Sequence, residues 1–375
     1  MNRRSLSFSI WLLLIVGGVL AAAQHAPSVL AAPGDSAVRG PEVEVIPLVE
    51  EGGRPDWSHA LNVIAYDRLG ADGYYDVHLI TPDGLLGPCM TCNHPNLPNK
   101  NIGNPAWHPN GQFLVIQVEK AVHDGTAASA TPGLGINNDI WLLGRDGSTV
   151  MQVTDVAEGM GVLHPHFSRD GRRLVWAERV AEGPNPSGIW VIRVLSFEDT
   201  ESLDVRSASV TTYMPMGPAL YETHGFSPDG SKIVFTAHDV IYQPNHSWLD
   251  IYTLELDTGA LQRLTFSPYG WDEHAHYTLD GQHMTWISSR DCNCFALPPD
   301  NISTELYLMN ADGTGKLKLT ALNDPLPPDA PRDIAADHSG PSGTSLVLYV
   351  QKGEETRPLE GRLVRVDLSP ELFAD

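Results

Sequence analysis

The chain has 375 residues, of which 42% are hydrophobic and 19% are charged, a composition typical of globular proteins. Its 24 lysines and arginines stand against 46 aspartates and glutamates, which gives a formal net charge of −22. A surface this acidic repels the phosphate backbone of nucleic acids and anionic membranes, so we expect neither as a partner.

The N-terminal segment has the pattern of an export signal. Two arginines precede an apolar run, Ile10–Ala23, and small residues follow up to Ala32. We therefore predict a signal peptide over residues 1–31 and a linker over residues 32–41, which would place the protein in the periplasm or outside the cell. A retained anchor is the alternative, although the run is shorter than the ~20 residues that a spanning helix needs. We expect no membrane span in the mature chain.

From residue 42 onward a pattern of paired strands repeats. Each copy has a short strand that ends in an aromatic residue, a polar turn closed by glycine, and a second strand with alternating apolar residues. The four clearest copies are Asn104–Val118, Leu163–Glu178, Glu222–Ala237 and Glu273–Ser288. Asn-Gly and Asp-Gly steps supply the positive φ that a tight hairpin turn requires. Further turns follow strand-like segments in most copies, so each repeat forms a meander of four strands.

Four-stranded units at a period of roughly 50–60 residues are typical of propeller blades. Weaker copies at Pro55–Arg68 and Ala335–Val350 bring the number of blades to six. The last copy lacks a fourth strand, which the segment Glu42–Glu50 can supply. We therefore predict an all-β fold: one domain over residues 42–375, a six-bladed β-propeller of four-stranded antiparallel blades that the N-terminal strand closes.

The "SPDG" turn (Ser227–Gly230) and the strand and turn "DIYTLELDTG" (Asp250–Gly259) follow this pattern closely. They resemble the repeats of the TolB-like, WD40-like (PD40) propellers of exported bacterial proteins. The resemblance covers nearly the whole chain from Glu42 to Leu368. It implies a fold rather than an activity, because this repeat family includes both binding scaffolds and enzymes.

Histidines recur on the strands that precede the turns. When the repeats are aligned on their turns, His166, His276 and His338 fall just before the position of the aromatic residue. His164 and His274 fall two residues earlier, and His224 lies between the two columns. The first strand of each blade is the innermost one, so all of these side chains are expected to lie around the axis of the propeller.

Two interpretations of the histidines stay open. They can hydrogen-bond to a neighbouring blade, as buried polar groups usually do. Alternatively they bind one divalent ion (Mn, Zn, Ca or Fe) or handle protons, since imidazole is the commonest metal ligand near neutral pH. In that case Glu222 and Glu273 would accept hydrogen bonds from ring nitrogens. The predicted ligands are His166, His224, His274 and His276, with His164 and His338 as further candidates.

The pair His274 and His276, with another histidine from a neighbouring blade, also resembles the metal site of oligogalacturonate lyases, which are propellers too. The resemblance implies that these two residues are paired ligands and that His224 or His166 is the third. It further implies that the ion binds a sugar carboxylate while a base removes the proton from the neighbouring carbon.

Four cysteines occur in two close pairs, Cys89 with Cys92 and Cys292 with Cys294. An even number in an exported chain predicts disulfides but does not determine their connectivity. One zinc ion bound by four thiolates is the alternative, because both loops are expected on the same face of the propeller. Covalent haem requires a histidine directly after the second cysteine, where this chain has Asn93.

The sequence thus leaves two functions open. The first is an exported, monomeric propeller that binds a small molecule, a saccharide or an envelope protein at the histidine-rich end of its channel. The second is a metal-dependent lyase or hydrolase that acts on an acidic polysaccharide. Apart from the divalent ion, no cofactor is expected.

Overall fold

The structure is a computed structural model that describes residues 43–123, 127–183, 187–201, 203–238, 249–267, 270–291, 303–324, 333–352 and 361–373. The predicted signal peptide and linker, and both Cys292 and Cys294, lie outside the described residues. Within the described residues, no helix is both long and apolar enough to cross a membrane.

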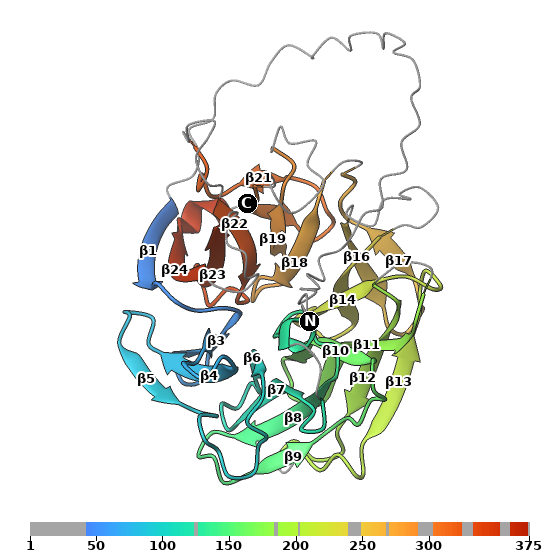
Figure 1. Cartoon of the computed structure of the whole chain (residues 1–375). Helices are drawn as coiled ribbons and strands as arrows, with labels where there is room; N and C mark the ends of the chain where they lie inside the picture. The colour runs from blue at the N-terminus through green and yellow to red at the C-terminus, as the bar shows by residue number, and fades with distance from the viewer. Residues whose placement is uncertain are drawn as a thin grey trace, which may run out of the picture.

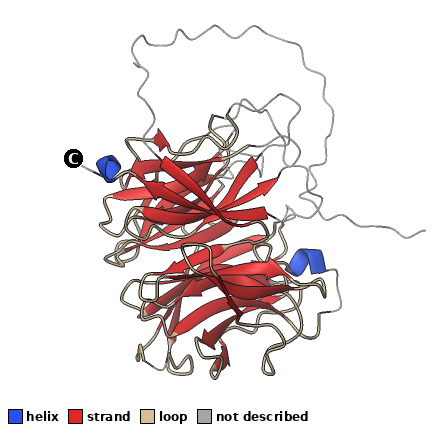
Figure 2. Ribbon diagram, turned by 90° about the vertical axis from the view of Figure 1, so that its left-hand side faces the viewer, coloured by secondary structure: helices blue, strands red, loops and turns tan. Residues whose placement is uncertain are grey.

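Six four-stranded antiparallel sheets form a ring around a central axis (Figure 1), which confirms the predicted six-bladed propeller. Figure 2 shows that strands make up almost all of the regular structure. The two short 3-10 helices of the described residues are η1 (Ala127–Ala130) and η2 (Pro370–Phe373).

In each blade the first strand is innermost. Blades one to three contain, from the inside outward, β2 (Pro55–Ser58), β3 (Val63–Leu69), β4 (Tyr75–Ile80) and β5 (Leu86–Cys89); β6 (Ile102–Trp107), β7 (Phe113–Glu119), β8 (Asn138–Gly144) and β9 (Val150–Gln152); and β10 (Gly161–Phe167), β11 (Arg173–Ala181), β12 (Ile189–Ser196) and β13 (Ser209–Tyr213).

Blades four to six continue the ring in chain order. They contain β14 (Tyr221–Phe226), β15 (Lys232–Ala237), β16 (Asp250–Glu255) and β17 (Leu261–Arg263); β18 (Asp272–Tyr277), β19 (His283–Ser288), β20 (Glu305–Asn310) and β21 (Leu317–Lys318); and β22 (Asp333–His338), β23 (Ser345–Lys352), β24 (Gly361–Leu368) and β1 (Val43–Val49).

The core is divided among the blades. Six apolar clusters of described residues each join two neighbouring blades, and the last of them joins blade six to blade one. The second strand of a blade therefore contacts apolar side chains on both of its faces, which is why segments such as Phe113–Val118 are apolar almost throughout. Burial between blades, rather than within one sheet, stabilises the ring.

Both ends of the propeller meet in blade six. β1 pairs antiparallel with β24, from Val43 opposite Leu368 to Val49 opposite Leu363. This pairing confirms the predicted closure by the N-terminal segment. It also leaves β24 with a neighbour on each side, so that its edge is not free to pair with another chain.

Candidate metal centre

The inner strands of blades two to six are interrupted by β-bulges close to the axis. The register shifts within each strand, between Gly103 and Ala106, Leu163 and His166, Thr223 and Phe226, Glu273 and His276, and Ala335 and Asp337. Inside the bulges Asn104, His164 and His274 have φ values of 48°, 49° and 51°. A bulge adds an unpaired residue and changes the direction of nearby side chains.

The bulges of blades three and five bring two His-x-His pairs together. The ring centroids of His164 and His274 lie 5.0 Å apart, and those of His166 and His276 lie 5.4 Å apart. His224, from the blade between them, lies 4.9 Å from His274. The four predicted ligands are thus neighbours, and His164 belongs to the same group.

The sixth histidine joins the group from blade six. The rings of His338 and His276 are 4.8 Å apart and nearly perpendicular. All six rings are buried except that of His166, which is half-buried. We refer to these six residues as the histidine cluster.

The backbone register corrects the alignment of blade six. In blade five the backbone N–H of Thr278, the residue after the aromatic Tyr277, donates a hydrogen bond to the carbonyl of His283 and so closes the turn. In blade six the equivalent hydrogen bond comes from Ser339. His338 therefore occupies the position of the aromatic residue, and the position just before it belongs to Asp337. The predicted alignment, which put His338 just before the aromatic position, was therefore wrong by one residue. The cause is that the last blade has no Asp-Gly turn on which to align it.

Asp337 is the functional candidate that the sequence did not reveal. Its Oδ1 lies 3.1 Å from Nδ1 of His274 and accepts a hydrogen bond of 2.7 Å from the backbone N–H of His338. The ligand atoms of Asp337, His276 and His338 lie within 4.8 Å of one another, and so do those of Asp337, His164 and His274. This carboxylate therefore connects the two halves of the histidine cluster.

Two threonines fix the orientation of histidine rings from the second strands. Thr285 Oγ1 lies 2.9 Å from Nε2 of His338, and Thr236 Oγ1 lies 2.7 Å from Nε2 of His224. In both rings the Nδ1 atom is buried and has no hydrogen-bond partner. A buried ring nitrogen without a partner is costly unless a ligand uses it. Metal-binding histidines are commonly oriented in this way through their other ring nitrogen.

The cluster holds one charged ring. Burial opposes protonation of His274, but the Asp337 carboxylate, with help from Glu273 and Glu222, outweighs burial and raises the pKa of His274 to about 9. Burial would raise the pKa of Asp337, yet the protonated His274 ring holds it well below its usual range. His274 and Asp337 thus form an ion pair at neutral pH.

The other five rings are neutral at pH 7. Burial and the nearby charge of His274 lower the pKa of His164 and His224 well below 6.5, and burial and His338 do the same for His276. Burial also lowers the pKa of His166 to about 4 and that of His338 to about 3. Only neutral imidazole can bind a metal ion, so the cluster is electrostatically prepared for one.

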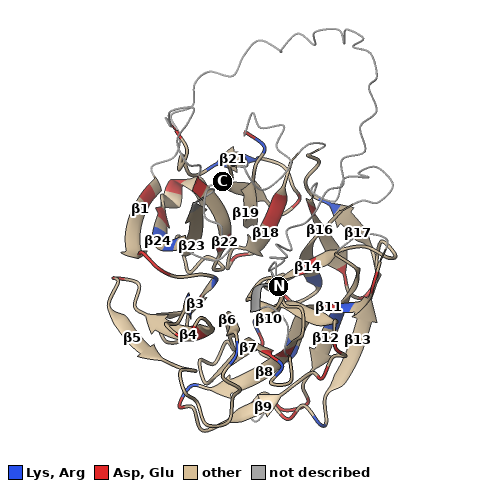
Figure 3. Cartoon of the chain, viewed as in Figure 1, with Lys and Arg blue, Asp and Glu red and all other residues tan. Residues whose placement is uncertain are grey.

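Glu222 and Glu273 lie on the opposite side of His274 from Asp337. Oε2 of Glu273 is 3.6 Å from Nε2 of His274, and Oε2 of Glu222 is 3.6 Å from Nε2 of His164. Both distances are longer than a hydrogen bond, so the predicted hydrogen bonds from ring nitrogens to these carboxylates are not formed. Burial, together with repulsion from Glu222, raises the pKa of Glu273 to about 8. Glu273 lies on β18, and Figure 3 shows acidic residues on this inner strand in red.

Arg54 is a further group at the axis, placed just before β2. Its Nε and Nη1 atoms are buried and have no hydrogen-bond partner among the described residues. Burial raises the pKa of Glu222, and the positive charge of Arg54 opposes this rise; the same charge helps to lower the pKa of Asp337. The guanidinium thus acts electrostatically on the histidine cluster. The sequence did not indicate a role for Arg54, because one arginine before a strand has no distinctive pattern.

Cys89 and Cys92 form a disulfide with a Cα–Cα distance of 5.7 Å. It joins the end of β5 to the loop that follows, at the outer edge of blade one. The pair therefore lies away from the inner strands that carry the histidine cluster.

The ionisation of the cluster predicts how stability depends on pH. The pKa of His274 is about 9 in the folded protein and near 6.5 when unfolded, so its contribution is complete below pH 6.5 and is lost as the pH rises through 9. Glu273, with a raised pKa of about 8, acts in the same direction. We expect the free energy of unfolding of the metal-free protein to fall by about 3 kcal/mol between pH 6.5 and 9.

Urea unfolding at the two pH values, with a chelator present, measures this change. The five neutral rings act in the opposite direction, because at pH 6.5 they are half protonated in the unfolded chain but neutral in the folded one. Together they offset roughly 2 kcal/mol, about as much as Glu273 adds to the decline. His274→Gln should remove most of the decline. An equal decline in His274→Gln and in the unchanged protein would show that other groups cause it.

Comparison with known proteins supports the fold. No protein-family model and no curated protein matches the sequence. The solved structure of a putative TolB from Agrobacterium tumefaciens matches with a TM-score of 0.53 and 16% identity, over 88% of this chain and 98% of that one. TolB from Acinetobacter baumannii matches with a TM-score of 0.49 and 16% identity, over 86% of this chain and 64% of that one.

An oligogalacturonate lyase in complex with manganese matches with a TM-score of 0.47 and 11% identity, over 88% of this chain and 92% of that one.

The chain spans less than two thirds of the Acinetobacter protein and nearly all of the Agrobacterium protein. The predicted resemblance to TolB-like propellers is confirmed for the fold.

Proposed function

We propose that this chain is an exported propeller that binds an anionic ligand through a divalent metal ion in the histidine cluster. The ion would be bound by His276, His338 and Asp337, with His166 as the nearest further ring. The observation that carries the proposal is the buried Nδ1 atom of His338, which has no partner although Thr285 holds the ring in place through Nε2.

The donor set indicates which ions fit. Two neutral imidazoles and one carboxylate suit Zn, Mn or Fe, whereas Ca prefers oxygen ligands alone. Asp337 keeps its negative charge because His274 stays protonated beside it. His274 therefore acts as a positioning residue that orients the carboxylate through its contact with Oδ1.

Arg54 supports an anionic ligand. A guanidinium is always charged, and it binds carboxylates or phosphates through paired N–H donors. The Nε and Nη1 atoms of Arg54, which have no hydrogen-bond partner among the described residues, can supply such donors. A bound ion would supply positive charge for one ligand oxygen, and Arg54 would donate hydrogen bonds to another. A small molecule, an acidic saccharide or a carboxylate of an envelope protein has this chemistry.

A metal-dependent lyase or hydrolase for acidic polysaccharide is the second candidate. Glu222 and Glu273 favour it, because a buried carboxyl with a pKa of about 8 can take up or release a proton near neutral pH. Turnover of an acidic oligosaccharide that is lost in Glu273→Gln, with metal content unchanged, would favour the enzyme. Binding without turnover would favour the ligand-binding module.

Export is part of the proposal. It is supported by the arginines and apolar run at the N-terminus and by the disulfide between Cys89 and Cys92, since disulfides persist mainly outside the cytosol. The mature protein is proposed to begin after residue 31 and to act as a monomer.

Metal titration tests the proposal directly. We expect the purified, chelator-treated protein to bind one equivalent of Zn or Mn. His276→Ala should lower the affinity by more than about 100-fold, because losing a ligand costs more than losing an outer hydrogen-bond partner. Thr285→Val removes only the group that orients His338 and should cost about tenfold.

His59→Ala is the matched control. His59 is exposed, and its one side-chain hydrogen bond among the described residues is with Ser342 Oγ, at 3.0 Å, so this variant should bind metal like the unchanged protein. Calorimetry and elemental analysis measure affinity and stoichiometry. If the unchanged protein binds no ion, or if His276→Ala binds as tightly, the cluster is a hydrogen-bonding network and the proposed function is wrong.

A further inference from the structure

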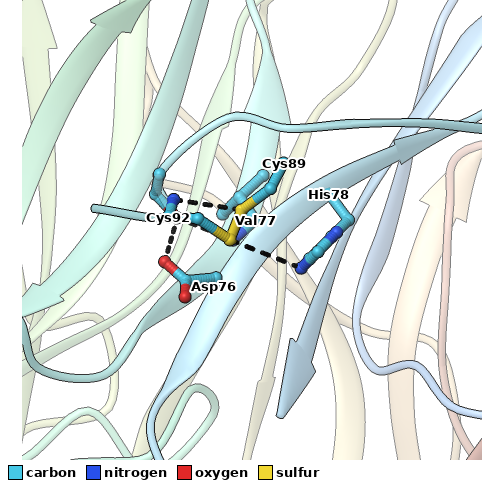
Figure 4. Close-up of a disulfide and its surroundings, with 6 residues drawn as sticks. Asp76, Val77, His78, Cys89 and Cys92 are labelled. Carbon is cyan, nitrogen blue, oxygen red and sulfur yellow. Dashed lines mark hydrogen bonds between the residues drawn. A yellow bond between two sulfur atoms is a disulfide. The ribbon is translucent and has the colours of Figure 1, made fainter. Parts of the chain in front are cut away.

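A second group of metal-binding side chains lies at the outer edge of blade one, away from the histidine cluster. His78 on β4 is directly opposite Cys89 on β5. Figure 4 shows the His78 ring turned toward the disulfide, and its Nε2 lies 3.9 Å from Sγ of Cys92. The ligand atoms of His78, Cys89 and Cys92 lie within 4.8 Å of one another.

This disulfide is accessible and contributes little to the fold. Cys92 is exposed, Cys89 is half-buried, and only Met90 and Thr91 separate them. A cross-link that closes so short a loop restricts the unfolded chain only slightly. Exposed disulfides are also the ones that are most readily reduced.

The loop stays in place without the sulfur–sulfur bond. The Thr91 hydroxyl donates to Asp76 Oδ1 at 2.6 Å and accepts from the backbone N–H of Val77 at 2.9 Å. The backbone N–H of Met90 also bonds to the carbonyl of Val77, at 2.7 Å. These bonds hold both cysteines beside β4 in either redox state.

A hydrogen bond also favours the reduced form. The backbone N–H of Cys92 points at Sγ of Cys89, at 3.0 Å. Donors of this kind stabilise a thiolate more than a neutral sulfur, because hydrogen bonds to charged acceptors are stronger. The reduced loop would therefore present a thiolate donor, a second thiol and an imidazole on one small surface.

We propose that reduction of Cys89–Cys92 opens a second metal site, in which both thiolates and His78 bind a thiophilic ion such as Zn(II). A dithiol donor, such as a thiol–disulfide oxidoreductase, supplies two electrons and two protons and becomes a disulfide itself. Binding of the ion then releases the two thiol protons, one from each cysteine. Two sulfurs, one nitrogen and one open position match tetrahedral zinc coordination. The site is independent of the histidine cluster.

Cobalt(II) is the probe that separates the two sites. Only thiolate ligands give the intense near-ultraviolet thiolate-to-cobalt absorption, which the histidine cluster cannot produce. The full chain carries Cys292→Ser and Cys294→Ser, so that only Cys89 and Cys92 contribute sulfur. After reduction we expect the absorption to saturate with one thiolate-bound cobalt per chain, whether or not the histidine cluster takes up a second ion, and we expect no such absorption before reduction.

Two further variants complete the test. His78→Ala should weaken cobalt binding by at least about tenfold, and His59→Ala, in the same blade, should not change it. Circular dichroism of the reduced chain confirms that the propeller is intact. Absence of the absorption in the folded, reduced protein would overturn the proposal, and so would equal affinity in His78→Ala.

Discussion

Asp337→Asn is expected to abolish metal binding and to lower the free energy of unfolding by about 3 kcal/mol, the lower end of what breaking a buried ion pair costs. Asparagine keeps the size of the side chain but removes the charge that both halves of the histidine cluster share. His274, whose pKa is raised to about 9 chiefly by this carboxylate, would lose its ion-pair partner at 3.1 Å. Metal titration and urea unfolding at pH 7 measure the two effects.

Asp56→Asn is the matched control. Asp56 occupies the equivalent position in blade one and is also enclosed, but burial raises its pKa to about 7, and its Oδ2 accepts a hydrogen bond from the backbone N–H of Trp107 at 2.6 Å. An asparagine oxygen can accept the same bond. This variant should keep its metal affinity. If Asp337→Asn also binds metal as before, the carboxylate is not a ligand.

Removal of β1 is expected to have the largest effect on the fold. A chain that begins at Glu50 lacks the pairing of β1 with β24, and it also lacks Leu48 and Val49, which pack against the cluster between blades six and one. We expect the free energy of unfolding to fall by roughly 5 kcal/mol, from lost backbone hydrogen bonds and apolar burial. The uncovered edge of β24 should also promote association.

A chain that begins at Val43 is the control, because it keeps all of β1. Denaturant unfolding and sedimentation velocity compare the two truncated chains. Equal stability and a monomeric state for both would show that the ring does not depend on this closure.

One feature of the site itself could be predicted from the sequence. Histidines before the turns were expected to meet at the axis, and the structure brings all six together. Their repetition in blades three and five was the signal, since equivalent positions of a propeller face the same axis. Asp337 was not predicted, because blade six lacks the Asp-Gly turn and its alignment was shifted by one residue. Arg54 was not predicted, because no other blade has an arginine at this position.

The proposed site at the disulfide shows a related limit. The spacing of Cys89 and Cys92 pointed to a cross-link or a metal site, yet nothing near them in the sequence indicated His78. The antiparallel register of β4 and β5 places His78 opposite Cys89. A cross-strand neighbour depends on where two strands pair, and the register of β4 and β5 shifts between His78 and Ile80, which the turn between the strands does not reveal.

The sequence by itself determined the architecture of this protein: strand alternation, glycine turns with positive φ, six blades and closure by the N-terminal strand. Each of these depends on local preferences that repeat along the chain, so that the copies support one another. Only the tertiary structure decided which side chains meet, through bulges on the inner strands and a register in blade six that differs by one residue from the aligned repeats. It also decided the charges, because burial keeps five rings neutral while the carboxylate of Asp337, helped by Glu273 and Glu222, keeps His274 protonated.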